Sequence, residues 1–274
     1  MPWFWVFRTV FCSSRLMKEE PFPDPPIVFL LMGASNLARG YSMLTHHLSE
    51  CLKKNKTEFL NALGPGRGFC ARGGIFNITY SPIQDSQVIE SAEKKSKEAL
   101  HTVVLFTDIG NDLMYGVSAD TLIASLDIMI DEILKWDADI FLTSIHVNLK
   151  KDISPTIFLV LRFLLFPSSK ANYEEMDLSI LQINDYLEDK VSENQRMHLI
   201  TGLEAFAGLD KIHYSLLKTH AAWSAVAEKI FRVINVPVQK NLRLMDGIRS
   251  IFSNLKRLIF CDMFFLKKKG REFF

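Results

Sequence analysis

Residues 27–40, with the sequence IVFLLMGASNLARG, join a run of apolar residues to a turn of small residues. An unbroken apolar run of this length, here 27–32, is typical of a strand that is buried on both faces of a parallel sheet. The segment 41–54 that follows carries the period of an amphipathic helix. The sequence therefore predicts a strand and a helix joined by the small residues 33–40.

The same alternation continues along the chain and predicts the fold class. Strands that alternate with helices favour right-handed crossovers, so we expect an α/β fold with a doubly wound, flavodoxin-like parallel sheet flanked by helices. In open sheets of this kind ligands bind outside the carboxyl ends of the strands, which makes the residues after each strand the first candidates for a site. Further strands are expected at 58–62, 102–107, 139–144 and 198–201, and further helices at 119–136 and 179–191.

Length and composition describe an ordinary globular chain. The 274 residues are 48% hydrophobic and 23% charged, which excludes a disordered tail, a collagen-like repeat and a disulfide-stapled miniprotein. Basic and acidic residues nearly balance, and the formal net charge is +1. We therefore expect no nucleic acid among the partners.

The four cysteines are widely spaced, with no C-x-x-C pair and no cluster with histidine at metal-ligand spacing. We interpret them as reduced, structural thiols, which favours a reducing, cytoplasmic compartment. Neither a metal nor a cofactor is expected. The four are Cys12, Cys51, Cys70 and Cys261.

Both ends of the chain differ in composition from the body, 27–236, which we expect to form one domain. The extension 1–26 opens with an apolar, aromatic run that lacks a cationic segment and a cleavage site and is too short to span a bilayer. We interpret 1–16 as a start-site artefact and the extension as non-native or disordered. The extension 237–274 has the pattern of a basic amphipathic helix, for which docking on the body is favoured over contact with an anionic membrane or a partner.

Ser35 places a hydroxyl in the turn after the first predicted strand. The backbone N–H groups at a helix N-terminus lack helical partners and favour negative charge, as an oxyanion site requires. Taken alone, however, a serine in such a turn is more often a helix N-cap.

Three later turns carry further candidates. Glycines crowd the turn after the second predicted strand, where backbone N–H groups could approach a ligand, but no Gly-Lys-Ser/Thr follows to make a nucleotide P-loop. After the third strand, Asn111 offers an amide donor and Asp112 can brace its loop through backbone bonds. Near the end of the sheet, Asp210 precedes His213 by three residues, a spacing that lets the carboxylate accept from one imidazole nitrogen while the other faces a nucleophile.

These four features occur in one order, each on a loop that follows a predicted strand. They are the blocks GASN at 33–36, GPGRG at 64–68, GND at 110–112 and DKIH at 210–213. In this order the sequence resembles the SGNH, or GDSL-type, hydrolase family, over about 27–234. The resemblance implies the three-layer architecture of that family.

Residue by residue, the resemblance implies a nucleophilic Ser35, a His213 general base and an orienting Asp210. It also implies an oxyanion hole formed by the Ser35 N–H, the Asn111 side-chain amide and the N–H of a glycine in the second block. We place that glycine at Gly66, with Gly68 as the rival.

The implied activity is that of a serine esterase, a carboxylic ester hydrolase that forms an acyl-serine intermediate. An acyltransferase with the same serine and histidine is one alternative, and a catalytically silent module that binds a carbohydrate or a lipid is another. The sequence departs from the family pattern at Ala34, which replaces the usual aspartate, at Gly40, one residue late, and at Tyr214, which replaces a frequent proline. The change at residue 34 puts the bracing of the nucleophile turn in question.

Substrate contacts are expected from residues beside these blocks and from the apolar run 157–166. That run could line an acyl pocket through Leu161 and Phe163, although a buried covering helix is the commoner structure for such a run. The expected substrate is a small-molecule or acylated ester. Further candidates for substrate contact are Asn36, Arg67 and Gly68.

Overall fold

The computed structural model describes residues 24–74, 78–166, 169, 171–237, 241–257 and 259–260. The predictions for 1–23 and 261–274, including those for Cys12 and Cys261, lie outside the described residues. Cys51 and Cys70 are free thiols, the first buried and the second half-buried.

Five parallel strands form the sheet in the order β2-β1-β3-β4-β5, which confirms the predicted fold class. The chain passes from β1, the second strand of the sheet, to the edge strand β2 and then back across to the other edge, so the direction of winding reverses beside β1. Each strand lies within one residue of its predicted bounds. The strands are β1 Ile27–Gly33, β2 Thr57–Leu63, β3 His101–Phe106, β4 Ala138–Thr143 and β5 Met197–Ile200.

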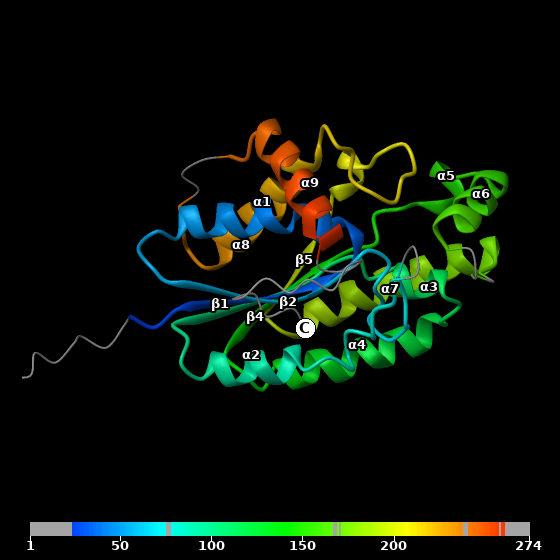
Figure 1. The fold of residues 1–274 in the computed structure, drawn as a ribbon. Coiled ribbons are helices and arrows are strands. Elements are labelled where there is room, and N and C mark those ends of the chain that lie inside the picture. Colours follow the sequence, from blue (N-terminus) through cyan, green and yellow to red (C-terminus); the bar gives the residue numbers. More distant parts are fainter. Residues whose placement is uncertain are drawn as a thin grey trace, which may run out of the picture.

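Helices cover both faces of the sheet, and so explain why its central strands are apolar throughout (Figure 1). In β1, Val28 and Leu30 pack into the core under α2, α4 and α7, whereas Phe29 and Leu31 pack into the core under α1 and α8. The first layer consists of α2 Val88–Ser96, α4 Ala119–Ile133 and α7 Tyr173–Glu193. The second consists of α1 Ser35–Cys51 and α8 Thr219–Val233, with α9 Leu244–Arg257 outside them. Four short helices lie in the connections: α3 Asn111–Met114, α5 Leu149–Asp152, α6 Pro155–Leu165 and the 3-10 helix η1 Leu203–Phe206.

Helix α1 begins six residues before its predicted start because the small-residue turn itself winds into the helix. Gly40 then lies inside α1, where a glycine weakens a helix. A Cβ at this position would collide with the Trp223 ring of α8. The late glycine therefore lets α8 pack closely on α1.

The C-terminal helix docks on the body, as predicted for this part of 237–274. The Ser253 hydroxyl of α9 lies 3.1 Å from that of Ser42, and the Ser250 hydroxyl donates to the Arg39 carbonyl at 2.8 Å. Within the described part of the chain, no helix has the length and apolar character needed to cross a bilayer.

Candidate active site

Ser35 is the first residue of α1 and follows β1 after one residue, at the carboxyl edge of the sheet. The N-cap of α1 is Ala34, and no side chain of the cap residue bonds to the helix. The interpretation of Ser35 as an N-cap is therefore wrong. Its half-buried side chain lines a cavity instead.

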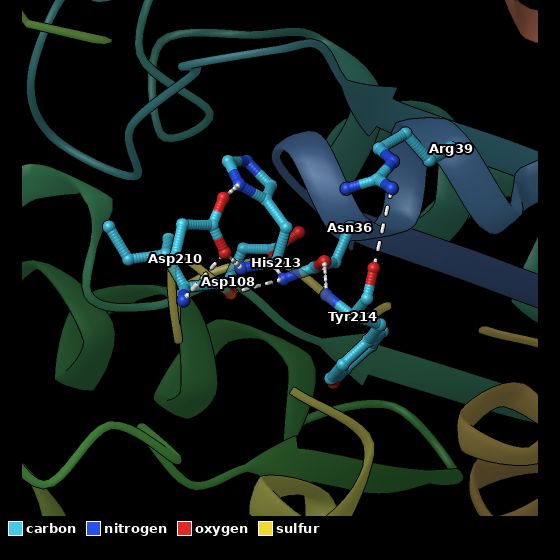
Figure 2. A network of polar contacts seen from close by, with 7 residues as sticks. Asn36, Arg39, Asp108, Asp210, His213 and Tyr214 are labelled. Atoms are coloured by element: carbon cyan, nitrogen blue, oxygen red, sulfur yellow. Dashed lines mark hydrogen bonds and ion pairs between the residues drawn. The ribbon is translucent and has the colours of Figure 1, made fainter. Parts of the chain in front are cut away.

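His213 and Asp210 form a hydrogen-bonded pair on the loop that follows β5 and η1 (Figure 2). Nδ1 of His213 lies 2.7 Å from Oδ2 of Asp210, while Oδ1 of Asp210 accepts from the His213 N–H at 2.9 Å and the Ile212 N–H at 3.1 Å. Burial would raise the pKa of Asp210, but the hydrogen bonds from His213 outweigh it and bring that pKa down to about 2. The carboxylate is thus charged at neutral pH and holds the imidazole by its Nδ1.

Asn36, the neighbour of the serine, ties α1 to the histidine loop (Figure 2). Its Nδ2 donates to the Ile212 carbonyl at 3.2 Å, and its Oδ1 accepts from the Tyr214 N–H at 2.9 Å. The residues on both sides of His213 are thereby held to the residue after Ser35. Asn36 also lines the cavity, so its contact with substrate stays a prediction.

In the third block, Asn111 and Asp112 both bond to the glycine-rich connection after β2. Asn111 lies on the cavity at the start of α3, and its Nδ2 donates to the Arg67 carbonyl at 3.2 Å. The fully buried Asp112 accepts three backbone N–H groups at 2.7 to 2.9 Å, so it does brace a loop through backbone bonds, but not its own loop as predicted. The braced segment belongs to the glycine-rich connection after β2, with donors Phe69, Cys70 and Ala71.

At both candidate glycines of the second block a larger residue would be strained or would collide with a neighbour. Gly66 has φ +75, which favours glycine, and its carbonyl accepts from the Tyr115 hydroxyl at 2.6 Å. A Cβ at Gly68 would stand 2.6 Å from Oδ1 of Asp112. Neither glycine is among the residues that line the cavity, so the choice between them stays a prediction.

The side chain of Arg67 is only 3% exposed, and its Nε donates to the Ser81 carbonyl at 3.0 Å. Burial lowers the pKa of this guanidinium to about 10. Arg67 does not line the cavity, and its backbone carbonyl serves as the acceptor for Asn111. The guanidinium is thus engaged within the loop, and its contact with substrate stays a prediction.

The cavity runs from Ser35 and Asn111 to an apolar wall under α6. Leu161 of α6 lines it, whereas Phe163 is 71% exposed and does not. The expectation of a buried covering helix is wrong for most of α6, because its outer face is open to solvent while its inner face covers the cavity. The apolar wall consists of Ile109, Met114, Ile145, Val147, Leu149, Ile153, Phe158, Leu161, Phe166, Met176 and Ile180.

Two further residues on the cavity are not among those that the sequence singled out. His146, after β4, packs its ring on that of Tyr214 with centroids 5.4 Å apart, and burial lowers its pKa. Asp108, after β3, bonds to the serine turn. Both follow the end of a predicted strand within two residues, and this position is the signal that could have found them.

The sheet defines a doubly wound α/β protein in which Ser35 and Asn111 line one cavity at the carboxyl edge. Neither Asp210 nor His213 lines that cavity; the pair lies on the loop that Asn36 ties to the turn of Ser35. No family model and no curated protein matches the chain. Solved structures with a similar fold include a member of the lipolytic G-D-S-L family from Veillonella parvula, 14% identical, covering 76% of this chain and 98% of that one at a TM-score of 0.45.

Two more are described as a lipase/acylhydrolase from Enterococcus faecalis and the esterase EstA from Pseudoalteromonas sp. The first is 12% identical, covers 77% of this chain and 98% of that one, and has a TM-score of 0.45. The second is 14% identical, covers 76% and 98%, and has a TM-score of 0.42. Identities and TM-scores this low leave the activity to be argued from the chain's own residues.

Proposed function

We propose that this protein is a serine hydrolase that cleaves a carboxylic ester through an acyl-serine intermediate. The observation that carries the proposal is the Asp210–His213 pair, joined at 2.7 Å on a loop that Asn36 ties to the turn of Ser35. A histidine held by a carboxylate beside a serine at a helix N-terminus is the arrangement that activates a hydroxyl nucleophile.

In the proposed reaction Nε2 of His213 takes the Ser35 proton, and the serine oxygen attacks the ester carbonyl. The Ser35 N–H and the Asn111 amide, with the N–H of Gly66 or Gly68, hold the oxyanion of the tetrahedral intermediate. His213 then protonates the departing alcohol, and water releases the acid by the same two steps. Asp210 keeps Nδ1 protonated, so that Nε2 is the atom that accepts the proton.

A fluorophosphonate probe tests this function without a guess about the substrate. We expect intact-mass analysis to find one adduct on the wild-type protein and none on Ser35→Ala, because only an activated serine attacks the probe's phosphorus. Peptide mapping should place the adduct on Ser35. A folded wild-type protein that forms no adduct, or an adduct that persists in Ser35→Ala, would contradict the proposal.

We also propose that the acyl group lies along the apolar wall, which sets a preference for long acyl chains. Leu161 is on that wall and Phe163, on the same helix, is not, so these two apolar positions form a matched pair. Leu161→Asn should lower kcat/KM for a decanoyl ester about tenfold, as expected from losing about 1.5 kcal/mol of apolar burial, and change that for an acetyl ester little.

Phe163→Asn is the control and should leave the ratio of the two kcat/KM values unchanged. Hydrolysis of p-nitrophenyl acetate and p-nitrophenyl decanoate measures both. An equal loss on the two esters in Leu161→Asn would mean that the substitution only destabilises the fold.

A further inference from the structure

The turn that carries Ser35 has no N-cap side chain that accepts a hydrogen bond from the first N–H groups of α1. Ala34 occupies the N-cap of α1, and an alanine side chain cannot accept from the N–H groups that open a helix. If Ser35 served as the cap instead, its oxygen would be bonded to the backbone and lost as a nucleophile. The helix therefore needs an acceptor that leaves the serine hydroxyl alone.

Asp108, which follows the neighbouring strand β3, supplies that acceptor. Strand β3 pairs with β1, with Phe106 opposite Met32, so the residue just after β3 lies beside the turn after β1. Oδ2 of Asp108 accepts from the Ala34 N–H at 2.9 Å and from the Leu37 N–H at 3.1 Å. These two donors flank the serine in sequence, and the Ser35 N–H is not one of them.

The other carboxylate oxygen reaches the histidine loop through Asn36. Oδ1 of Asp108 accepts from Nδ2 of Asn36 at 2.8 Å, and Asn36 in turn bonds to the backbone of Ile212 and Tyr214. One carboxylate thus holds the serine turn and, through a single amide, the loop that carries His213.

The backbone conformation of Asp108 is one that functional sites often hold in place. Its φ is +59, in the left-handed region that non-glycine residues rarely adopt. Such conformations persist where surrounding bonds hold them, and they concentrate at functional sites. Here the three bonds accepted by the carboxylate hold it.

We propose that Asp108 is a positioning residue that replaces the missing acid of the nucleophile block and fixes Ser35 relative to His213. The inference rests on the proposed serine hydrolase function. Asp108 acts through Ala34, Leu37 and Asn36, since its oxygens are taken up by these donors. Its negative charge also lies at the N-terminus of α1, where a helix favours an anion.

Asp108→Gly tests the proposal, because glycine accepts the left-handed backbone while the whole side chain, carboxylate included, is removed. Asp108→Asn keeps the shape and one acceptor oxygen. The matched control is Asp139→Asn, since Asp139 bonds to His101 and His198 on neighbouring strands and does not line the cavity. For each protein we would measure the thermal midpoint, the fraction of Ser35 labelled by a fluorophosphonate at completion, and kcat and KM for p-nitrophenyl acetate.

We expect Asp108→Gly to label completely but slowly, with kcat per labelled serine at least tenfold below wild type and KM within twofold. The kcat per labelled serine of Asp108→Asn should lie between those of wild type and Asp108→Gly. That of Asp139→Asn should equal the wild-type value. A merely structural role would lower the thermal midpoint or the labelled fraction and leave kcat per labelled serine unchanged, which would overturn the proposal. If Asp108→Gly does not fold, the same comparison on Asp108→Asn decides.

The two proposals fail in different ways. A wild-type protein that does not label removes the hydrolase function, and with it the role of Asp108. A wild-type protein that labels, with an Asp108→Gly variant equally active per labelled serine, removes only the role of Asp108.

Discussion

His213→Ala is expected to lower kcat for a soluble ester on the order of 10⁴-fold, with little change in KM. Without the imidazole no group takes the proton of Ser35, so the hydroxyl stays a weak nucleophile. The effect should fall on kcat because the proton moves in the transition state and not when the ester binds. Initial rates with p-nitrophenyl acetate, after subtraction of spontaneous hydrolysis, measure it.

A second histidine of this chain provides a close control. His198 is also bonded to an aspartate, with its Nε2 3.0 Å from Oδ1 of Asp139, but it lies within β5 and not on the loop that Asn36 ties to the turn of Ser35. His198→Ala should therefore keep kcat within a few-fold of wild type. Comparable losses in His198→Ala and His213→Ala would show that breaking any His–Asp pair disables the fold, and would contradict a general base at His213.

Asn111→Ala is expected to lower kcat on the order of a hundredfold or more, which corresponds to about 3 kcal/mol of transition-state stabilisation. The side-chain amide carries two N–H bonds, and the Arg67 carbonyl accepts from this nitrogen at 3.2 Å. That bond orients the amide, and the second N–H is the one we assign to the oxyanion. Steady-state kinetics with the acetyl ester checks this prediction.

Asn194→Ala is the control for the same substitution. Asn194 caps the turn before β5 through the Arg196 N–H, at the opposite end of that strand from the histidine loop. Its loss should affect stability alone. A kcat for Asn111→Ala within a few-fold of wild type would remove Asn111 from the oxyanion hole.

In the cavity, the residues assigned to the reacting ester group come from other segments than the residues assigned to the rest of the ester. Ser35 and Asn111 stand where β1 and β3 end, and the apolar wall is built mainly from segments after β4. In a parallel sheet all strands end at one edge, so residues far apart in the chain meet there. Changes in the wall should therefore alter substrate preference while leaving attack on a fluorophosphonate intact.

The sequence alone was sufficient for most features that depend on neighbours in the chain. Apolar runs predict the strands because their burial on both faces requires it, and the strand bounds agree within one residue. The Asp210–His213 pair could be predicted equally well, because the two residues are three positions apart on one loop and their side chains meet locally. The start of α1 was predicted less well because small residues do not show the period of a helix.

Only the tertiary structure decided which distant groups meet. The order of the sheet brings β3 beside β1, so a carboxylate 74 residues away caps the helix of Ser35 in place of its own N-cap residue. Tertiary packing turns Leu161 inward and Phe163 outward, and it buries Arg67, three outcomes that composition cannot distinguish. The physical reason is that such contacts depend on how whole elements pack, and the local pattern of a segment does not specify its distant neighbours.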